Sequence, residues 1–242
     1  DLQLQLDNAK NGFIYFSLGS NIKSKRLPES TRKIFLETLA ELPYTVLWKF
    51  EEENLPGKPD NVIISKWFPQ QDILGHPNLK LFITQGGLQS TEEAIYNNIP
   101  MVGIPFIGDQ QSNVQRMVNK GIALLVDHET INKATLKAAI LEVINNPSYR
   151  NKIKELAELA KDQPMTGLES AVWWTEYVIR HKGAEHLRSP ALDIPDYQYF
   201  LLDVIGFCLL VALIVIYVLY KVVKLMYKLV RYFVPKQKVK VQ

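Results

Sequence analysis

Cysteine is nearly absent from this sequence: Cys208 is the single one among 242 residues. A lone cysteine excludes a disulfide within the chain and cannot build a thiolate metal site. It also leaves the redox compartment unspecified. Histidine is scarce as well, with four in the chain. We predict neither a metal site nor a bound cofactor.

Acidic residues are missing after Asp203, where seven basic residues follow. The whole chain carries 28 basic and 25 acidic residues, a net charge of +3. Without those seven, the chain has 21 basic and the same 25 acidic residues, a net charge of −4. The basic character therefore belongs to the tail, and the globular part has no electrostatic basis for binding nucleic acid.

Charged residues are also missing from Val204 to Tyr220, and Phe200–Leu202 can extend this run past Asp203. As a helix rising about 1.5 Å per residue, it spans roughly 25–30 Å, enough for the hydrocarbon core of a bilayer. Tyrosines flank it on both sides, as the membrane interface favours: Tyr197, Tyr199, Tyr217, Tyr220 and Tyr227. We predict a transmembrane helix at 200–220. The alternative, a buried core helix, would gain nothing from the cations that follow.

The excess of Lys and Arg after this run predicts a cytoplasmic tail at 221–242, with the globular part on the other side of the membrane. The last five residues, Lys238-Val239-Lys240-Val241-Gln242, resemble the Lys-x-Lys-x-x pattern that returns proteins to the endoplasmic reticulum. The alternative is a basic cluster attracted to anionic lipid. We predict a single-pass protein of the endoplasmic reticulum membrane, with a lumenal globular part and membrane lipid as a partner.

The length of 242 residues suffices for one ordinary domain with appendages. The chain opens at Asp1 and lacks the basic stretch and apolar run of a signal peptide. We expect that any targeting signal, and any second domain, lies upstream of this sequence.

Strand-like and helix-like patterns alternate through the first half of the chain. Apolar runs typical of strands lie at 13–17, 45–50, 62–67, 81–84 and 101–104, and helical patterns lie at 27–42, 88–97 and 109–119. This alternation predicts a parallel sheet covered by helices on both faces, the doubly wound α/β class. Three more helices are predicted in 131–146, 148–162 and 167–181, and 188–199 is typical of a connector. We therefore predict one domain over 1–187, followed by the connector, the transmembrane helix and the tail.

Residues 67–113 carry a dense pattern of fixed spacings. It comprises Trp67-x-Pro69-Gln70, Leu74-x-His76-Pro77, Phe82-Ile83-Thr84-x-Gly86-Gly87, Ser90, Glu93-Ala94, Pro100, Pro105 and Asp109-Gln110-x-x-Asn113. The pattern resembles the signature of the family 1 UDP-dependent glycosyltransferases, and among them the membrane-bound animal UDP-glucuronosyl- and UDP-glucosyltransferases. The TQGGLQSTEEAI variant is most similar to the insect or other arthropod branch. The resemblance covers essentially the whole chain and implies a GT-B-type, C-terminal Rossmann-like domain that binds a UDP-sugar.

Three features suit a nucleotide sugar on physical grounds alone. Trp67, at a strand end, can stack its indole on a base. Gly86-Gly87, between a strand and a helix, lets the backbone approach a phosphate at the helix N-terminus. Glu93, two turns into that helix, can accept hydrogen bonds from two vicinal hydroxyls. Taken singly, each also has a simpler explanation: a packed surface aromatic, a tight turn and a solvated carboxylate.

The resemblance implies roles for further residues. In these roles Trp67 stacks on uracil, and Gln70 lies beside the nucleoside. The pyrophosphate is faced by Gln85, Ser90 and Ser20, with Ser17 and Gly19 in the same strand turn as Ser20. Gln89 and Glu93 hold the phosphate–ribose region, and Asp109 and Gln110 contact the hydroxyls of the transferred sugar. Asp109 alone is equally well explained as the N-cap of its helix. His76, before Pro77 in a turn, is expected to be structural, and no chemistry is assigned to His181 or His186.

Gln85 departs from the family pattern, because most members have His at this position. Hydrogen bonds to charged groups contribute about 1.5–3 kcal/mol, and neutral ones about 0.5–1.5 kcal/mol. We expect Gln85 still to hold the phosphate, with several-fold weaker donor affinity unless other donors compensate.

The resemblance implies inverting transfer of a hexosyl group, glucose favoured over glucuronate, from a UDP-sugar to a small lipophilic acceptor. In the family, the acceptor site and the catalytic base, a His oriented by an Asp, belong to the N-terminal half. None of the four histidines here has that context, so the chain is expected to bind donor without transferring sugar by itself. One alternative is a truncated, non-catalytic UDP-sugar binder or homo- or hetero-oligomer partner. Another is a tail-anchored α/β domain for a different nucleotide or a structural role.

Overall fold

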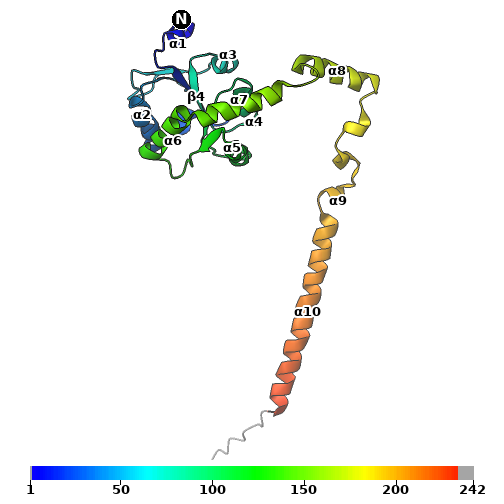
Figure 1. Ribbon diagram of the computed structural model, residues 1–242. Helices are drawn as coiled ribbons and strands as arrows, with labels where there is room; N and C mark the ends of the chain where they lie inside the picture. Colours follow the sequence, from blue (N-terminus) through cyan, green and yellow to red (C-terminus); the bar gives the residue numbers. More distant parts are fainter. Residues whose placement is uncertain (1, 234–242) are drawn as a thin grey trace, which may run out of the picture. The chain divides into compact units, whose positions relative to one another are not determined.

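The computed structural model describes residues 2–233 (Figure 1). The chain divides into two compact units, Asp1–Pro164 and Met165–Gln242. The first holds the sheet and the helices that cover it, and the second holds the remaining helices. Each unit is described by itself.

The first unit is built on a six-stranded sheet with the order β3-β2-β1-β4-β5-β6, in which every neighbouring pair is parallel. Its strands are β1 (Phe13–Ser17), β2 (Thr45–Lys49), β3 (Val62–Ser65), β4 (Leu79–Thr84), β5 (Met101–Gly103) and β6 (Ala123–Leu125). The predicted α/β class with a parallel sheet is therefore confirmed. Five of the strands match predicted runs, whereas the three-residue edge strand β6 was not predicted.

Helices lie on both faces of this sheet. They are α1 (Leu2–Asp7), α2 (Glu29–Ala40), α3 (Gln70–Leu74), α4 (Leu88–Tyr96), α5 (Gln110–Asn119), α6 (Lys133–Asn145) and α7 (Pro147–Lys161), with a 3₁₀ turn η1 at Ser24–Arg26. The short α1 and α3 were not predicted. The helix predicted at 27–42 begins at Glu29 as α2, and Pro28 is its N-cap.

Alternation along β1 explains the two layers of core. Ile14 and Phe16 pack with side chains of α2 and α6, whereas Phe13 and Tyr15 pack with side chains of α3, α4 and α7. Successive side chains of a strand point to opposite faces, so a strand covered on both sides must be apolar throughout. All five residues of β1 are buried. The near-continuous apolar run that predicted two-sided burial has this cause.

His76 links α1 to the sheet, as a structural residue would. The side chain is buried, its Nε2 lies 3.1 Å from Asp7 Oδ1, and its Nδ1 accepts a hydrogen bond from the backbone N–H of Asn78. Its ring also meets Phe13 edge-on. These contacts are on the side of the sheet where β1 and β4 begin.

The second unit contains α8 (Gly167–Arg180), α9 (Asp196–Tyr199), α10 (Leu202–Phe233) and the 3₁₀ turns η2 (Glu185–Leu187) and η3 (Pro190–Asp193). A capping box between Thr166 and Glu169 starts α8, yet neither α8 nor α10 has a buried residue. The predicted domain 1–187 differs from this division, because α8 falls in the second unit. The predicted connector at 188–199 contains two short helical turns.

Residues 202–220 of the predicted membrane segment at 200–220 belong to α10, which is long and apolar enough to cross a membrane. Its 32 residues span about 48 Å at 1.5 Å per residue, more than one hydrocarbon core requires. The helix therefore continues well beyond the predicted end at residue 220. The Lys-x-Lys-x-x pattern at 238–242 lies outside the described residues.

Candidate functional site

A cavity of about 440 Å³ opens at the carboxyl ends of β1, β2 and β3. This edge of a parallel sheet is where ligands bind in doubly wound folds. Eight predicted site residues line it: Ser17, Gly19, Ser20, Trp67, Gln70, Gln89, Ser90 and Glu93. Six unpredicted residues complete the lining: Tyr15, Lys49, Phe68, Pro69, Gln71 and Asp72.

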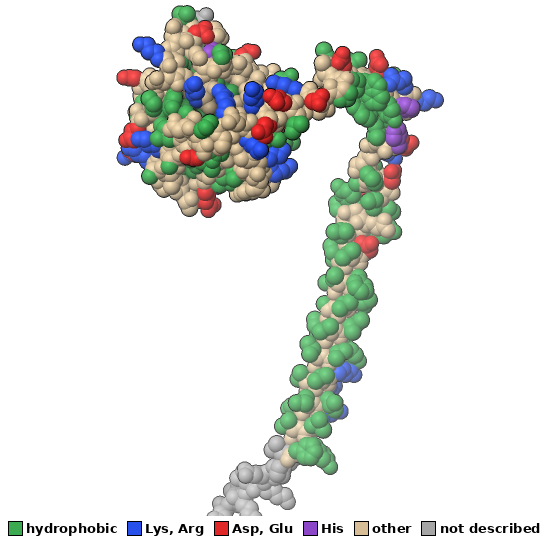
Figure 2. Space-filling model, in the orientation of Figure 1, with side chains coloured by type: hydrophobic (Ala, Val, Ile, Leu, Met, Phe, Trp, Pro, Cys, Tyr) green, Lys and Arg blue, Asp and Glu red, His purple; other side chains and the backbone are tan. Residues whose placement is uncertain are grey.

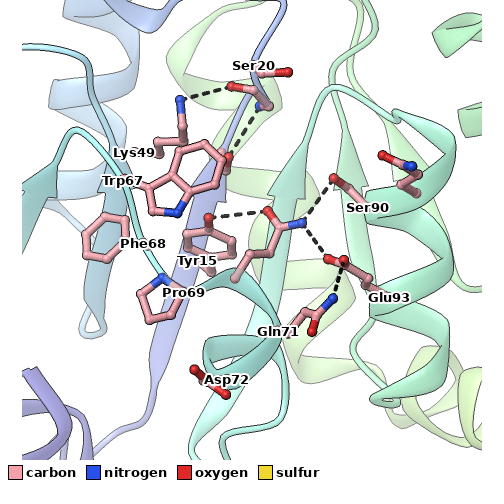
Figure 3. A pocket seen from close by; sticks show the side chains of 14 residues that line it. Tyr15, Ser20, Lys49, Trp67, Phe68, Pro69, Gln71, Asp72, Ser90 and Glu93 are labelled. Atoms are coloured by element: carbon pink, nitrogen blue, oxygen red, sulfur yellow. Dashed lines mark hydrogen bonds between the residues drawn. The ribbon is translucent and has the colours of Figure 1, made fainter. Parts of the chain in front are cut away.

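A hydrogen-bond network holds the carboxylate of Glu93 in this cavity (Figure 3). Gln70 Nε2 donates to Glu93 Oε2 at 2.7 Å and to Ser90 Oγ at 3.1 Å, and Gln71 Nε2 donates to Glu93 Oε1 at 3.2 Å. The glutamines begin α3 directly after Pro69, and Glu93 lies in the second turn of α4. Each carboxylate oxygen can accept a second hydrogen bond, so the group is oriented and can still receive two hydroxyls.

Tyr15 anchors the other end of this network. Its hydroxyl donates to Gln70 Oε1 at 3.3 Å. Burial raises the pKa of Tyr15 to about 12, with Glu93 adding to the rise and a hydrogen bond with Ser17 opposing it. The hydroxyl is therefore protonated at neutral pH and able to donate. No sequence pattern indicates this role, because Tyr15 occupies an ordinary apolar position of β1.

Trp67 presents its indole to the cavity two residues after β3. Its side chain is 71% exposed, although it is large and apolar. The hydroxyl of Ser65 donates to the Trp67 carbonyl at 2.8 Å and accepts from its N–H at 3.4 Å, which fixes the backbone. An exposed aromatic ring on a fixed backbone, beside polar groups, is suited to stacking on a flat ring.

Lys49, at the end of β2, is the one basic side chain among the residues that line the cavity. Its side chain is only 7% exposed. The ammonium donates to the Gly19 carbonyl at 3.0 Å and to Glu51 Oε1 at 3.2 Å. Its sequence signal was weak: a lysine closing an otherwise apolar strand, Val46-Leu47-Trp48-Lys49.

Five predicted site residues do not line the cavity: Gln85, Gly86, Gly87, Asp109 and Gln110. Gln85 is buried, and its Oε1 accepts from Gln110 Nε2 at 3.1 Å. Gln110 Oε1 in turn accepts from the backbone N–H groups of Phe106 and Ile107. Both amides of this pair are engaged within the protein, so their contacts with phosphate and sugar stay predictions.

Asp109 is the N-cap residue of α5, the simpler alternative for this position, but its side chain makes no capping hydrogen bond. Its Oδ2 instead accepts from Asn113 Nδ2 at 2.8 Å. Its predicted contact with a sugar hydroxyl also stays a prediction.

Gly86 is required by packing as well as by conformation. Its φ is +86°, and a Cβ there would lie 2.3 Å from Val114 Cγ2 on α5. The absence of a side chain at Gly86 therefore lets α5 approach the end of β4. Gly19 is constrained in the same way, with φ +70° and Gln85 Nε2 2.4 Å from the position of a Cβ. Gln85 thus lies against the turn that carries Ser20.

Together these groups offer an exposed aromatic face, an oriented carboxylate, a turn with hydroxyls and one cation. Such a set complements a flat base, a vicinal diol and an anionic group. Among residues 2–233 no cluster of three or more His, Cys, Asp or Glu side chains is placed to hold a metal ion.

Comparisons with known proteins agree with the motif. Residues 4–239 match the family model described as UDP-glucoronosyl and UDP-glucosyl transferase. The chain is 44% identical over 220 residues to UDP-glycosyltransferase UGT5 of Dactylopius coccus, covering 91% of this chain and 42% of that protein. It is 45% identical over 223 residues to UDP-glucuronosyltransferase 2B13 of Oryctolagus cuniculus, covering 92% and 42%. The chain thus spans about two fifths of the length of these relatives.

The fold also matches solved structures. Os79 from O. sativa in complex with UDP superposes with a TM-score of 0.61 at 20% identity, covering 69% of this chain and 40% of that one. At that identity the likeness shows a shared GT-B fold and no more. The family-model match over nearly the whole chain and the close relatives lead to one conclusion: this chain belongs to the UDP-glucuronosyl and UDP-glucosyl transferase family.

Proposed function

We propose that the chain is the donor-binding half of a transferase that moves a hexosyl group from a UDP-sugar to a small lipophilic acceptor. The observation that carries the proposal is the Glu93 carboxylate, held on both oxygens by Gln70 and Gln71 in the cavity that Trp67 also lines. Uracil stacks on Trp67, the ribose diol donates to Glu93, and the diphosphate lies at the Ser20 turn near Gln89 and Ser90 at the start of α4.

Titration with UDP tests this proposal. We expect saturable binding that weakens at least ten-fold in Trp67→Ala, because the base loses its stacking surface. Trp174→Ala is the matched control, since Trp174 is also an exposed tryptophan but belongs to α8. Binding that is absent, or that is insensitive to Trp67→Ala, would contradict a donor site here and favour a different nucleotide or a structural role.

The transfer step needs a general base, which the family resemblance assigns to a histidine oriented by an aspartate. None of the four histidines lines the cavity, and the carboxylate of Glu93 is already engaged by two amides. A general base must reach the acceptor hydroxyl while that oxygen attacks the anomeric carbon. We infer that this base and the acceptor pocket lie outside this chain, so the chain binds donor and transfers nothing alone.

Donor choice is tested on a protein that also contains the acceptor half. We expect radiolabelled glucose from UDP-glucose to appear on members of a panel of small phenols, in preference to glucuronate from UDP-glucuronate. A preference for glucuronate would reverse the donor assignment and keep the family. Transfer with neither donor, despite UDP binding, would favour the alternative of a non-catalytic UDP-sugar binder or oligomer partner.

We also propose that α10 anchors the protein in the endoplasmic reticulum membrane, with the donor site in the lumen and the tail in the cytosol. Four cations follow the uncharged part of the helix at spacings of three, four and three residues: Lys221, Lys224, Lys228 and Arg231. Such spacing puts them on one side of a helix, where they can meet anionic headgroups. Protease protection of intact microsomes tests the orientation: the sheet unit should be protected and a C-terminal epitope tag should be cleaved.

A further inference from the structure

Lys49 lies between the two loops that are proposed to hold the ends of the donor. In the sheet order β3-β2-β1, the strand β2 runs between the strands that lead to Trp67 and to the Gly19–Ser20 turn. Lys49 ends β2 and pairs in register with Ser65, the residue whose hydroxyl fixes the Trp67 backbone. The topology therefore puts one cation at the midpoint of the cavity wall.

The contacts of the ammonium join these loops. It donates to the Gly19 carbonyl at 3.0 Å on one side and lies 5.7 Å from the centroid of the Trp67 ring on the other (Figure 3). A cation this close to an aromatic ring is attracted to the ring's electron-rich face. Glu51, whose side chain is 13% exposed, accepts a third contact at 3.2 Å and balances the charge.

Burial makes this arrangement rigid. A lysine side chain that is nine-tenths buried must keep its charge paired and hydrogen-bonded, because an unpaired ammonium is strongly disfavoured away from water. The Gly19 carbonyl cannot be replaced by solvent as easily as at a surface site. The φ of +70° at Gly19 also leaves that turn few alternative conformations.

We propose that Lys49 is a positioning residue of the donor site, which fixes the distance between the base-stacking Trp67 and the phosphate-facing Ser20. This inference rests on the proposed function. A ligand that spans both loops, a nucleoside diphosphate, depends on Lys49. A ligand that reaches only Trp67 and Glu93, a nucleoside, does not.

Calorimetric titration with UDP and with uridine tests the proposal. In Lys49→Met we expect the dissociation constant for UDP to rise about five- to twenty-fold and that for uridine to rise less than two-fold. Lys49→Arg, which keeps a cation on a long side chain, restores UDP affinity to within about three-fold of wild type. Glu52→Gln, which changes an exposed carboxylate that pairs with Lys25 and does not line the cavity, stays within about two-fold.

A double-mutant cycle separates positioning from general loosening. If Lys49 acts through the turn, adding Lys49→Met to Ser20→Ala weakens UDP binding less than two-fold further, because the group that it positions is already gone. Additive effects, or equal weakening of UDP and uridine by Lys49→Met, overturn the proposal. If Lys49→Met does not fold, Lys49→Leu, which also lacks a donor for the Gly19 carbonyl, gives the same comparison. If the wild-type chain does not bind UDP, the proposed function is wrong. If wild type and Lys49→Met bind UDP equally well, only the positioning role of Lys49 is wrong.

Discussion

The sheet unit and the C-terminal unit handle apolar side chains in opposite ways. In β1 all five residues are buried, whereas α8 and α10 contain no buried residue. Figure 2 shows the same contrast, with charged and apolar side chains mixed over the sheet unit and apolar side chains along nearly all of α10. Residues 2–164 thus supply their own core, while the apolar surface of α10 requires an environment other than water. A lipid bilayer is the environment that a helix of this length and hydropathy fits.

The largest effect is expected from charged substitutions in α10, which test whether this helix anchors the protein in a membrane. Val211→Arg combined with Ile214→Arg puts two cations near the middle of the proposed span, at about 2.5–3.5 kcal/mol each by insertion scales. We expect most of the protein to move from the membrane pellet to the supernatant on alkaline extraction, with UDP binding unchanged. Val211→Leu with Ile214→Leu is the control and should stay in the pellet. Full retention of the arginine variant would show that α10 is not the anchor.

A second change compares one tryptophan from each unit. Trp48 is fully buried and stacks on Phe16 with ring centroids 4.8 Å apart, and its Nε1 donates to Ser24 Oγ. Trp48→Ala should lower the free energy of unfolding of the sheet unit by about 3–5 kcal/mol, because it leaves a cavity in the core. The half-exposed Trp174 lies outside that core, so Trp174→Ala should change the same quantity by no more than about 0.5 kcal/mol. Urea denaturation followed by circular dichroism measures both, and similar losses would show that the units share one core.

A third change tests the network that distinguishes the sheet unit as a binding site. Glu93→Gln removes the charge that accepts the ribose hydroxyls, and hydrogen bonds to charged groups contribute about 1.5–3 kcal/mol. We expect UDP affinity to fall roughly 10- to 100-fold, with little change for 2′,3′-dideoxy-UDP. Glu92→Gln, on the exposed neighbour in α4, should leave both affinities unchanged. Equal losses of affinity for UDP and for 2′,3′-dideoxy-UDP would show that Glu93 does not bind the ribose diol.

The smallest expected effect concerns Gln85, which is bonded to Gln110 behind the Gly19 turn. Gln85→Ala should weaken UDP binding roughly two- to ten-fold, the range of one neutral hydrogen bond of about 0.5–1.5 kcal/mol. Gln85→His should bind UDP more tightly than Gln85→Ala, and more so at pH 6 than at pH 8, because a protonated imidazole makes a charge-assisted bond. Unchanged UDP affinity in Gln85→Ala would show that Gln85 does not hold the phosphate.

Strong local patterns predicted most of the helices and strands, and the elements with weak patterns were missed. The strand at 13–17 and the helices α4, α6 and α7 followed from apolar runs and helical spacing. The edge strand β6 was missed because Ala123-Leu124-Leu125 contains no β-branched or aromatic residue. The helix α3 was missed because five residues after Pro69 give too short a signal.

The site prediction has gaps of a different kind. Trp67, Gln70 and Glu93 of the motif line one cavity, whereas Gln110 of the same motif does not line it and bonds to Gln85 and to the loop before α5. Lys49 was overlooked because its strand has no motif. A residue type at a fixed spacing does not show in which direction its side chain points.

The sequence by itself determined the alternation of strands and helices, the family and the apolar run at the C-terminal end. These properties depend on local periodicity, on composition and on spacings within one stretch of chain. Only the tertiary structure decided that Tyr15, Lys49 and Trp67 share one cavity, and that Gln85 and Gln110 engage each other. The reason is physical: the order β3-β2-β1-β4 brings together strand ends that are tens of residues apart, and hydrogen-bond partners across them are fixed by packing rather than by sequence distance.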